Sequence, residues 1–101
     1  MKHLRFDPRA RRDIDEAIGY YAEAYSPACV GLLDAIEHVL HLLCHHPDAG
    51  TIVRRGARKW PLSKYPYLIV YRVQGDDLVV LAVAHMKRRS GFWLERLREP
   101  G

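Results

Sequence analysis

The sequence predicts a small α+β protein in which a helix hairpin packs on a twisted, mainly antiparallel sheet. Two adjoining segments in the first half space their apolar residues as amphipathic helices do. Two segments after Gly50 are apolar at nearly every position and rich in Val, Ile and Tyr, as central strands are. A length of 101 residues allows one ordinary hydrophobic core. We therefore expect a single domain over residues 1–101 with the order β-α-α-β-β-β and room for a short C-terminal helix over 92–98.

The first half of the chain carries one strand signal and two helix signals. Residues 3–6 alternate polar and apolar side chains, which is typical of a short strand. Asp7-Pro8 and Ser26-Pro27 each combine an N-cap residue with proline at the first helical position, so two helices start there. Pro47 and Gly50 end the second helix. Two helices of similar length joined by a few residues form an antiparallel hairpin.

The second half changes to strand patterns. Residues 51–64 contain β-branched and basic residues, and residues 65–73 and 78–85 are the two strongly apolar segments. The residues between these two segments, Gln74-Gly75-Asp76-Asp77, are typical turn residues. We expect a hairpin of two central strands here.

Cysteine use and hydropathy indicate the compartment. Cys29 and Cys44 lie about four turns apart on the second expected helix, so they cannot form a disulfide within it. No apolar run approaches the roughly 18 residues of a membrane span, and the first residues lack the apolar stretch of a signal peptide. We expect a cytoplasmic protein with reduced thiols and no membrane partner.

The charge is divided unevenly between the two halves. Residues 1–50 carry five Lys or Arg and eight Asp or Glu, whereas residues 51–101 carry eleven and four. The balances of −3 and +7 make up the net charge of +4. A positive field over the second half attracts phosphates or carboxylates.

Basic residues on the expected strands are the main candidates for binding a partner or nucleic acid. They could converge on one surface that contacts phosphates, or form a solvated basic surface, or be covered by an acidic partner chain. Arg72 stands on the same side of its strand as Leu68 and Val70, so it must reach the sheet's rim or pair with an anion. The candidate set is Arg54, Arg55, Arg58, Lys59, Lys64, Arg72, Lys87, Arg88, Arg89 and the aromatic Trp93.

Histidines at two places in the sequence are candidate chemical sites. His41 and His45 have a spacing that can hold a metal, but they share a helix face with His38, Asp34 and Glu37, so we favour a solvated face and expect no metal and no cofactor. His85 ends the last apolar strand beside fixed cations, which suits a base or a hydrogen-bond donor. We favour the alternative, a strand-end histidine bonded to backbone. There is no nucleophile motif, glycine-rich phosphate loop or CxxC pair.

Several segments resemble RelE/ParE-family toxins, in order and over nearly the whole chain. AVAHMKRRSGFW (82–93) resembles the closing signature of that family, and YPYLIVYRV (65–73), preceded by the basic stretch with Arg58, is similar to its preceding strand. Pro47-Asp48-Ala49-Gly50 is similar to its helix-to-sheet turn. The residues that resemble its first helix are Ala10, Asp13, Ile14, Ile18, Tyr20 and Tyr21.

The resemblance implies the toxin of a type II toxin-antitoxin module, of the kind that inhibits growth and stabilises plasmids. Its implied partner is a small cognate antitoxin whose C-terminal segment wraps the toxin. ParE-like members inhibit DNA gyrase and are not enzymes, whereas RelE-like members are endoribonucleases that cleave mRNA on the ribosome. In the second case Arg58, Arg72, His85 and Arg88 are the candidate catalytic residues. No tyrosine follows Tyr71 and the closing aromatics are Phe92-Trp93, so the ParE branch is favoured and the RelE branch is the alternative.

Overall fold

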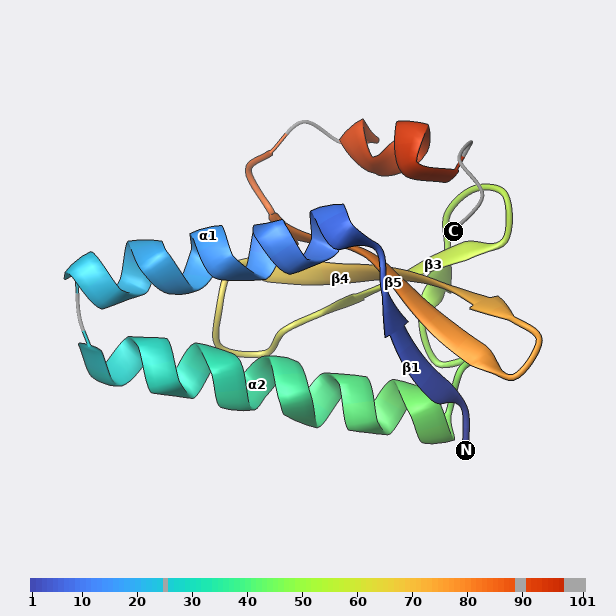
Figure 1. Cartoon of the computed structure of the whole chain (residues 1–101), viewed down its shortest axis with the longest axis horizontal. Coiled ribbons are helices and arrows are strands. Elements are labelled where there is room, and N and C mark those ends of the chain that lie inside the picture. The colour runs from blue at the N-terminus through green and yellow to red at the C-terminus, as the bar shows by residue number, and fades with distance from the viewer. Residues whose placement is uncertain (25, 89–90, 98–101) are drawn as a thin grey trace.

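The computed structural model describes residues 1–24, 26–88 and 91–97. The elements follow the expected order (Figure 1). They are β1 (His3–Phe6), α1 (Pro8–Ala24), α2 (Ser26–His45), β2 (Thr51–Ile52), β3 (Ala57–Pro61), β4 (Tyr67–Gln74), β5 (Asp77–His85) and the 3-10 helix η1 (Phe92–Leu97). The predicted α+β class and the helix hairpin are confirmed, and the expected Arg98 end of the C-terminal helix lies outside the described residues.

The sheet has five strands in the order β1-β5-β4-β3-β2. The pairs among β2, β3, β4 and β5 are antiparallel, while β1 runs parallel to β5 and pairs His3 with Asp77 through Phe6 with Val80. The segment expected as one strand over 51–64 contains two short strands. Between them Arg55 and Gly56 both have positive φ, at 51° and 80°, which makes a tight turn.

Helices α1 and α2 cover one face of the sheet and η1 covers part of the other (Figure 1). On the helix face, Leu32 and Ile36 of α2 pack with Ile69, Leu78 and Val80 of the central strands. On the opposite face, Leu97 of η1 packs with the alternate strand residues Ala57, Val70, Val79 and Leu81. The two faces follow from the period of two along each strand.

Helix α2 has an apolar character that the core explains. The stretch Pro27–His45 is long and apolar enough to cross a membrane by length and composition. Its residues Leu32, Ile36, Leu40 and Leu43 are buried against the sheet and α1. A core helix of a globular protein has this same composition, so we assign its hydropathy to packing.

Strand β5 contains a β-bulge at Leu81, whose side chain packs on the η1 side of the sheet. Val70 of β4 pairs with Ala82, but the next residue, Tyr71, pairs with Val80, so Leu81 is the extra residue on β5. A bulge disrupts the ladder and leaves backbone groups that need other partners. The partners found here are side chains, as described below.

Candidate functional site

The predicted basic residues are divided between two ends of the sheet. Arg54 and Arg55 lie at the β2–β3 turn, near the end of β4 that carries Arg72. Lys64, Lys87 and Arg88 lie at the other end, where the Met86 amide donates to the Pro66 carbonyl at 2.8 Å. His85 pairs with Tyr67, five residues along β4 from Arg72, which is roughly 17 Å at the rise of an extended strand. The basic residues therefore do not form one patch, and Arg89 lies outside the described residues.

The alternation of side chains also separates the candidates by face. Arg58 pairs with Tyr71 and shares its side, the helix face, whereas Lys59 pairs with Val70 and shares the opposite face with Arg72. Arg72 is half-buried and its guanidinium donates to the Gln74 amide oxygen, at 2.6 Å from Nη2 and 3.2 Å from Nε, when that amide is turned toward it. Arg58, Arg72 and His85 are thus not brought together.

Arg58 and Tyr71 hold the turn between α2 and β2. The Tyr71 hydroxyl donates to the Pro47 carbonyl at 2.8 Å and accepts from the Gly50 amide at 2.9 Å. Arg58 Nη1 donates to the carbonyls of Gly50 at 2.8 Å and Asp48 at 3.1 Å. Tyr71 is fully buried, and this burial raises the pKa of its hydroxyl, partly offset by the Gly50 hydrogen bond. These contacts give Arg58 a structural role.

Glycine is required at position 50 because a larger residue would collide with Tyr71. A Cβ there would lie 2.5 Å from the Tyr71 hydroxyl oxygen and 2.8 Å from its Cε1, well inside van der Waals contact. The Pro47–Gly50 segment that resembled the family's turn is therefore defined by the Tyr71 ring beneath it.

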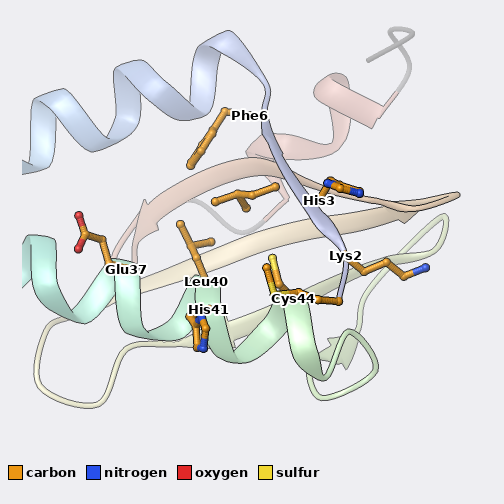
Figure 2. Close-up of a pocket in the computed structure, with 9 residues that line it drawn as sticks. Lys2, His3, Phe6, Glu37, Leu40, His41 and Cys44 are labelled. Carbon is orange, nitrogen blue, oxygen red and sulfur yellow. The ribbon is translucent and has the colours of Figure 1, made fainter.

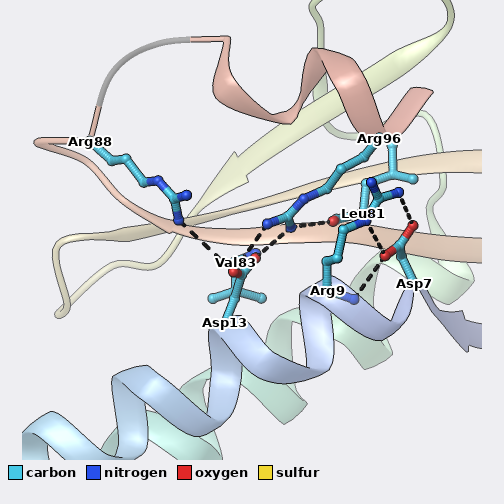
Figure 3. Close-up of polar contacts among 7 residues, drawn as sticks. All are labelled: Asp7, Arg9, Asp13, Leu81, Val83, Arg88 and Arg96. Atoms are coloured by element: carbon cyan, nitrogen blue, oxygen red, sulfur yellow. Dashed lines mark hydrogen bonds and ion pairs between the residues drawn. The ribbon is translucent and has the colours of Figure 1, made fainter. Parts of the chain in front are cut away.

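A buried ion pair between Asp13 and Arg96 joins α1, β5 and η1 (Figure 3). Arg96 donates through Nη1 to Asp13 Oδ2 at 2.7 Å and through Nη2 to Oδ1 at 3.3 Å. The pair also satisfies backbone groups beside the bulge, because Arg96 donates to the Leu81 carbonyl at 2.7 Å and the Val83 amide donates to Asp13 at 3.1 Å. Sequence reasoning missed Arg96, since 83 residues separate it from Asp13 and no local pattern links them.

Arg88 lies at the edge of this ion pair and stacks on an aromatic ring. Its Nη1 is 4.0 Å from Asp13 Oδ1, and its guanidinium carbon is 3.6 Å from the centroid of the Phe92 ring. The Arg88 side chain is about half exposed (48%). The stacking braces the guanidinium while leaving it accessible to an anion.

His85 shares a cleft of about 190 Å³ with Arg88, Tyr20 and Tyr67. Its Nδ1 accepts from the Lys87 backbone amide at 3.1 Å, so a neutral ring carries its hydrogen on Nε2. Burial raises the pKa of Tyr67, whose ring contacts the His85 ring edge-to-face at 5.1 Å. The backbone bond is the arrangement we favoured for His85; a role in binding stays a prediction.

The remaining candidates lie apart from this cleft. Trp93 is half-buried against the η1-side core and borders a hollow of about 360 Å³ together with Arg54. His41 and His45 stack edge-to-face with ring centroids 4.5 Å apart. Within the described part of the chain, no three His, Cys, Asp or Glu side chains are grouped so as to hold a metal ion. Cys29 and Cys44 are free thiols.

A groove between β1 and α2 was not predicted from the sequence. Figure 2 shows Phe6, Leu40 and Cys44 between these two elements, with Lys2, Glu37 and His41 around them. The groove has a volume of about 600 Å³. It is bordered by β1, which is an edge strand, and by α2, whose Cys44 carbonyl accepts from the Lys2 amide at 3.0 Å.

Comparisons with known proteins place this fold and these surfaces in a family. A family model described as the ParE toxin of the type II toxin-antitoxin system parDE matches residues 4–90. No curated protein matches the chain. A solved structure titled as the chromosomal ParDE toxin-antitoxin system from P. aeruginosa has a similar fold, with a TM-score of 0.73 at 21% sequence identity, covering 84% of this chain and 96% of that one. The chain belongs to the ParE toxin family of type II toxin-antitoxin systems.

Proposed function

We propose that this toxin acts in the cytoplasm by binding DNA gyrase and inhibiting it, and that a cognate antitoxin neutralises it. The observation that carries the proposal is the ParE family match over residues 4–90. The similar P. aeruginosa structure, whose title names a ParDE toxin-antitoxin system, supports an antitoxin partner. In this reading the chain is a binding protein that performs no chemistry of its own.

The geometry of the candidate catalytic residues supports binding over RNA cleavage. Cleavage of a phosphodiester needs groups placed together around one phosphate. Arg58 is engaged with the Asp48 and Gly50 carbonyls on the helix face, and Arg72 lies on the opposite face. His85 lies at the far end of the sheet from Arg72.

The proposal is tested by adding the purified chain to DNA gyrase and relaxed plasmid. We expect supercoiling to fall with increasing toxin and to return when an equimolar amount of the antitoxin is added. Toxin that has been denatured by heat serves as the unfolded-toxin control. Undiminished supercoiling at saturating folded toxin would reject gyrase as the target.

One observation keeps ribosome-dependent mRNA cleavage as a second candidate. His85 and Arg88 line the same cleft with two tyrosines and with the carboxylates of Asp13 and Glu16, so groups able to exchange protons and one guanidinium border one small volume. The test is mRNA cleavage in a translating ribosome mixture, comparing the chain with His85→Gln and Arg88→Gln variants. Cleavage that both substitutions abolish would establish this function instead.

The affinity of the proposed antitoxin complex should have an electrostatic component, which its dependence on salt concentration measures. The second half of the chain carries eleven Lys or Arg against four Asp or Glu, so an acidic partner segment gains from long-range attraction. We expect the affinity to fall between low and high ionic strength, because the Debye length shortens. An affinity that is independent of salt would assign the complex to apolar contacts alone.

A further inference from the structure

Two arginines lie on one line across the sheet, on the face that η1 partly covers. Arg5 pairs with Val79, and Val79 pairs with Arg72, so the three residues share one register position. Val79 packs with Leu97 of η1, which places Arg5 and Arg72 on the η1 face as well. Two strand spacings, roughly 10 Å, separate them. Two guanidinium groups therefore flank Val79 on this face.

The β2–β3 turn brings a third arginine to the same face. The Ala57 amide donates to the Arg54 carbonyl at 2.9 Å, and Ala57 pairs with Arg72. Arg54 borders the same hollow as Trp93 of η1, so its side chain lies on the η1 side of the turn. Arg5, Arg54 and Arg72 are called the arginine cluster below.

The guanidinium groups of the arginine cluster are available to an external anion. Arg5 pairs with Asp77 at 3.0 Å, but the two side chains are 48% and 30% exposed, so the pair contributes little and a phosphate can replace the carboxylate. Arg72 donates to the Gln74 amide oxygen, which carries no charge. Among the described side chains, no carboxylate lies within ion-pair distance of Arg54 or Arg72.

The charges next to the cluster leave an excess of positive charge. Lys59 is exposed on the η1 face, diagonal to Arg72 across the β3–β4 pair, and Arg55 is exposed in the β2–β3 turn. Asp76 is exposed in the β4–β5 turn, beside Asp77. The three arginines of the cluster and these two cations face two described carboxylates, an excess of three positive charges that attracts a polyanion.

The exposed apolar side chains of the strands lie on the other face. They are Leu4, Ile52 and Val73, which are 41%, 64% and 36% exposed. Leu4 and Val73 both pair with Leu78, and Ile52 pairs with Arg58, so all three share the helix face. The core of a protein interface is apolar and depleted of charge, whereas phosphate contacts need only basic groups placed on a surface. The arginine cluster therefore fits a phosphate backbone better than a protein partner.

We propose that the arginine cluster binds the phosphate backbone of duplex DNA, and that it holds the toxin against the DNA that gyrase carries. The second part rests on the proposed function, which supplies gyrase and its DNA. Contacts to phosphates carry no sequence information, so the cluster binds a duplex of any sequence.

The first test is binding of a short labelled DNA duplex to the folded chain, measured by fluorescence anisotropy without gyrase. Three phosphate contacts give a slope of about −2.7 for the logarithm of affinity against the logarithm of salt concentration, or roughly fortyfold between about 50 and 200 mM salt. The absence of binding at the lower salt concentration would overturn the inference. Inhibition of supercoiling by the same preparation would then leave the proposed function standing.

The second test locates the DNA contact by substitution. Arg5→Gln, Arg54→Gln and Arg72→Gln should each weaken duplex binding several-fold at low salt and make the slope shallower by about 0.9. Arg5 and Arg54 are exposed, so their variants should keep the fold, which circular dichroism checks. Arg12→Gln removes the same charge from an exposed position on α1 and should leave the slope unchanged. Equal weakening by Arg12→Gln would mean that binding follows the net charge alone, and the inference would be wrong.

The third test asks whether the cluster acts in the inhibited gyrase complex. The variant with all three arginines changed to glutamine should require roughly tenfold more toxin, or more still, for half inhibition of supercoiling. Inhibition as strong as that of the wild type would overturn the inference and leave the proposed function intact. Retained duplex binding with lost antitoxin binding would assign the cluster to an acidic protein instead. If the wild-type chain does not inhibit gyrase, the proposed function fails, and the contact with gyrase-bound DNA fails with it.

Discussion

One edge of the sheet is closed along one half and open along the other. Beyond Val80, where β1 has ended, side chains form hydrogen bonds with the backbone of β5. Arg96 donates to the Leu81 carbonyl, and Asp13 accepts from the Val83 amide. Along β1, the His3 and Asp7 amides donate to β5, so the alternate amides of Leu4 and Phe6 point away from it. A groove of about 600 Å³ lies between β1 and α2. The fold thus satisfies the β5 backbone beyond the end of β1 with side chains, and directs the Leu4 and Phe6 amides away from the sheet.

This difference separates residues that stabilise the fold from surfaces that can bind. Four polar residues stabilise the fold through hydrogen bonds to other groups of the chain: Asp13, Arg96, Arg58 and Tyr71. The open half is apolar and is bordered by charges. For a protein that acts through partners, an unpaired strand edge is a more informative feature than a charged residue that is already paired.

The largest expected effect on the free energy of unfolding comes from removing the Asp13 carboxylate in the closed half of this edge. Asp13→Ala leaves Arg96 buried beside Leu81 without its carboxylate, and we expect a loss of about 3–5 kcal/mol in the free energy of unfolding. Asp13 and Arg96 are 8% and 9% exposed, so solvent cannot replace the lost partner. Urea unfolding monitored by circular dichroism measures the loss. Asp15→Ala, exposed on the same helix, is the control and should stay within about 0.5 kcal/mol.

Tyr71→Phe should have the next largest effect, because it removes a buried hydroxyl that makes two hydrogen bonds. We expect a loss of about 1–3 kcal/mol, since the Gly50 amide and Pro47 carbonyl lose their partner. The pH dependence has a definite sign. Burial raises the pKa of Tyr71 above its ordinary value of 10.0, so its contribution to stability is full below that pH and is lost as the pH rises above it.

The free energy of unfolding, measured from pH 8 to 11, tests whether the contribution of Tyr71 is lost as the pH rises. The wild type should lose more stability than Tyr71→Phe over this range, and Tyr20→Phe, at a side chain 66% exposed, should behave as the wild type does. Identical alkaline profiles for the wild type and Tyr71→Phe would contradict the buried hydroxyl.

Asp7 lies at the end of β1, between the two halves of this sheet edge. Its substitution should reduce the free energy of unfolding less than the two changes above. Its amide donates to Val80 at the end of β1, and its carboxylate caps α1 by accepting from the Arg9 amide at 2.8 Å. Asp7→Ala should cost about 1 kcal/mol at pH 7 and Asp7→Asn less, since Asn also caps helices. The hydrogen bond from the Arg9 side chain lowers the pKa of Asp7 below 3.8, so this stability is present above that pH and is lost as the pH falls below it.

Thermal unfolding at pH 7 and pH 3 distinguishes the cap from the charge. Asp7→Asn should retain most of the stability at pH 7 and should lose less than the wild type on acidification. An Asn variant as unstable as the Ala variant would assign the whole effect to the carboxylate charge.

A substitution in the open half, along β1, should have the smallest effect on the free energy of unfolding. Leu4→Pro removes no hydrogen bond to β5, and proline is tolerated in an edge strand when its nitrogen faces solvent. We expect a change within about 1 kcal/mol in the free energy of unfolding. A loss as large as that of Asp13→Ala would mean that the Leu4 amide is already paired within the chain.

The features predicted correctly from the sequence are those with local signals. The Asp7-Pro8 and Ser26-Pro27 caps gave the two helix starts, and the Gly75 turn between two apolar segments gave the β4–β5 hairpin. The parallel pairing of His3 with Asp77 joins residues that are far apart in sequence, and no local pattern predicts it. The same holds for the Asp13–Arg96 pair and for the groove, which depends on how far α2 stays from β1.

Of the alternatives left open for the basic residues, convergence of the whole set on one surface does not occur among the described ones, for a physical reason. Neighbouring strands bring residues together only when they share a face and a register position. Arg58 and Lys59 point to opposite faces, and His85 lies opposite Tyr67 instead of Arg72. Charge counting predicted a basic half of the chain, but it could not predict how the strands divide those charges.

We propose that this chain stops growth by acting on DNA gyrase. The most direct test follows DNA and protein synthesis in parallel by pulse labelling after controlled induction of the toxin. We predict that DNA synthesis stops first and that DNA breaks accumulate. If protein synthesis stops first while DNA remains intact, gyrase is not the target and the His85–Arg88 cleft becomes the site to study.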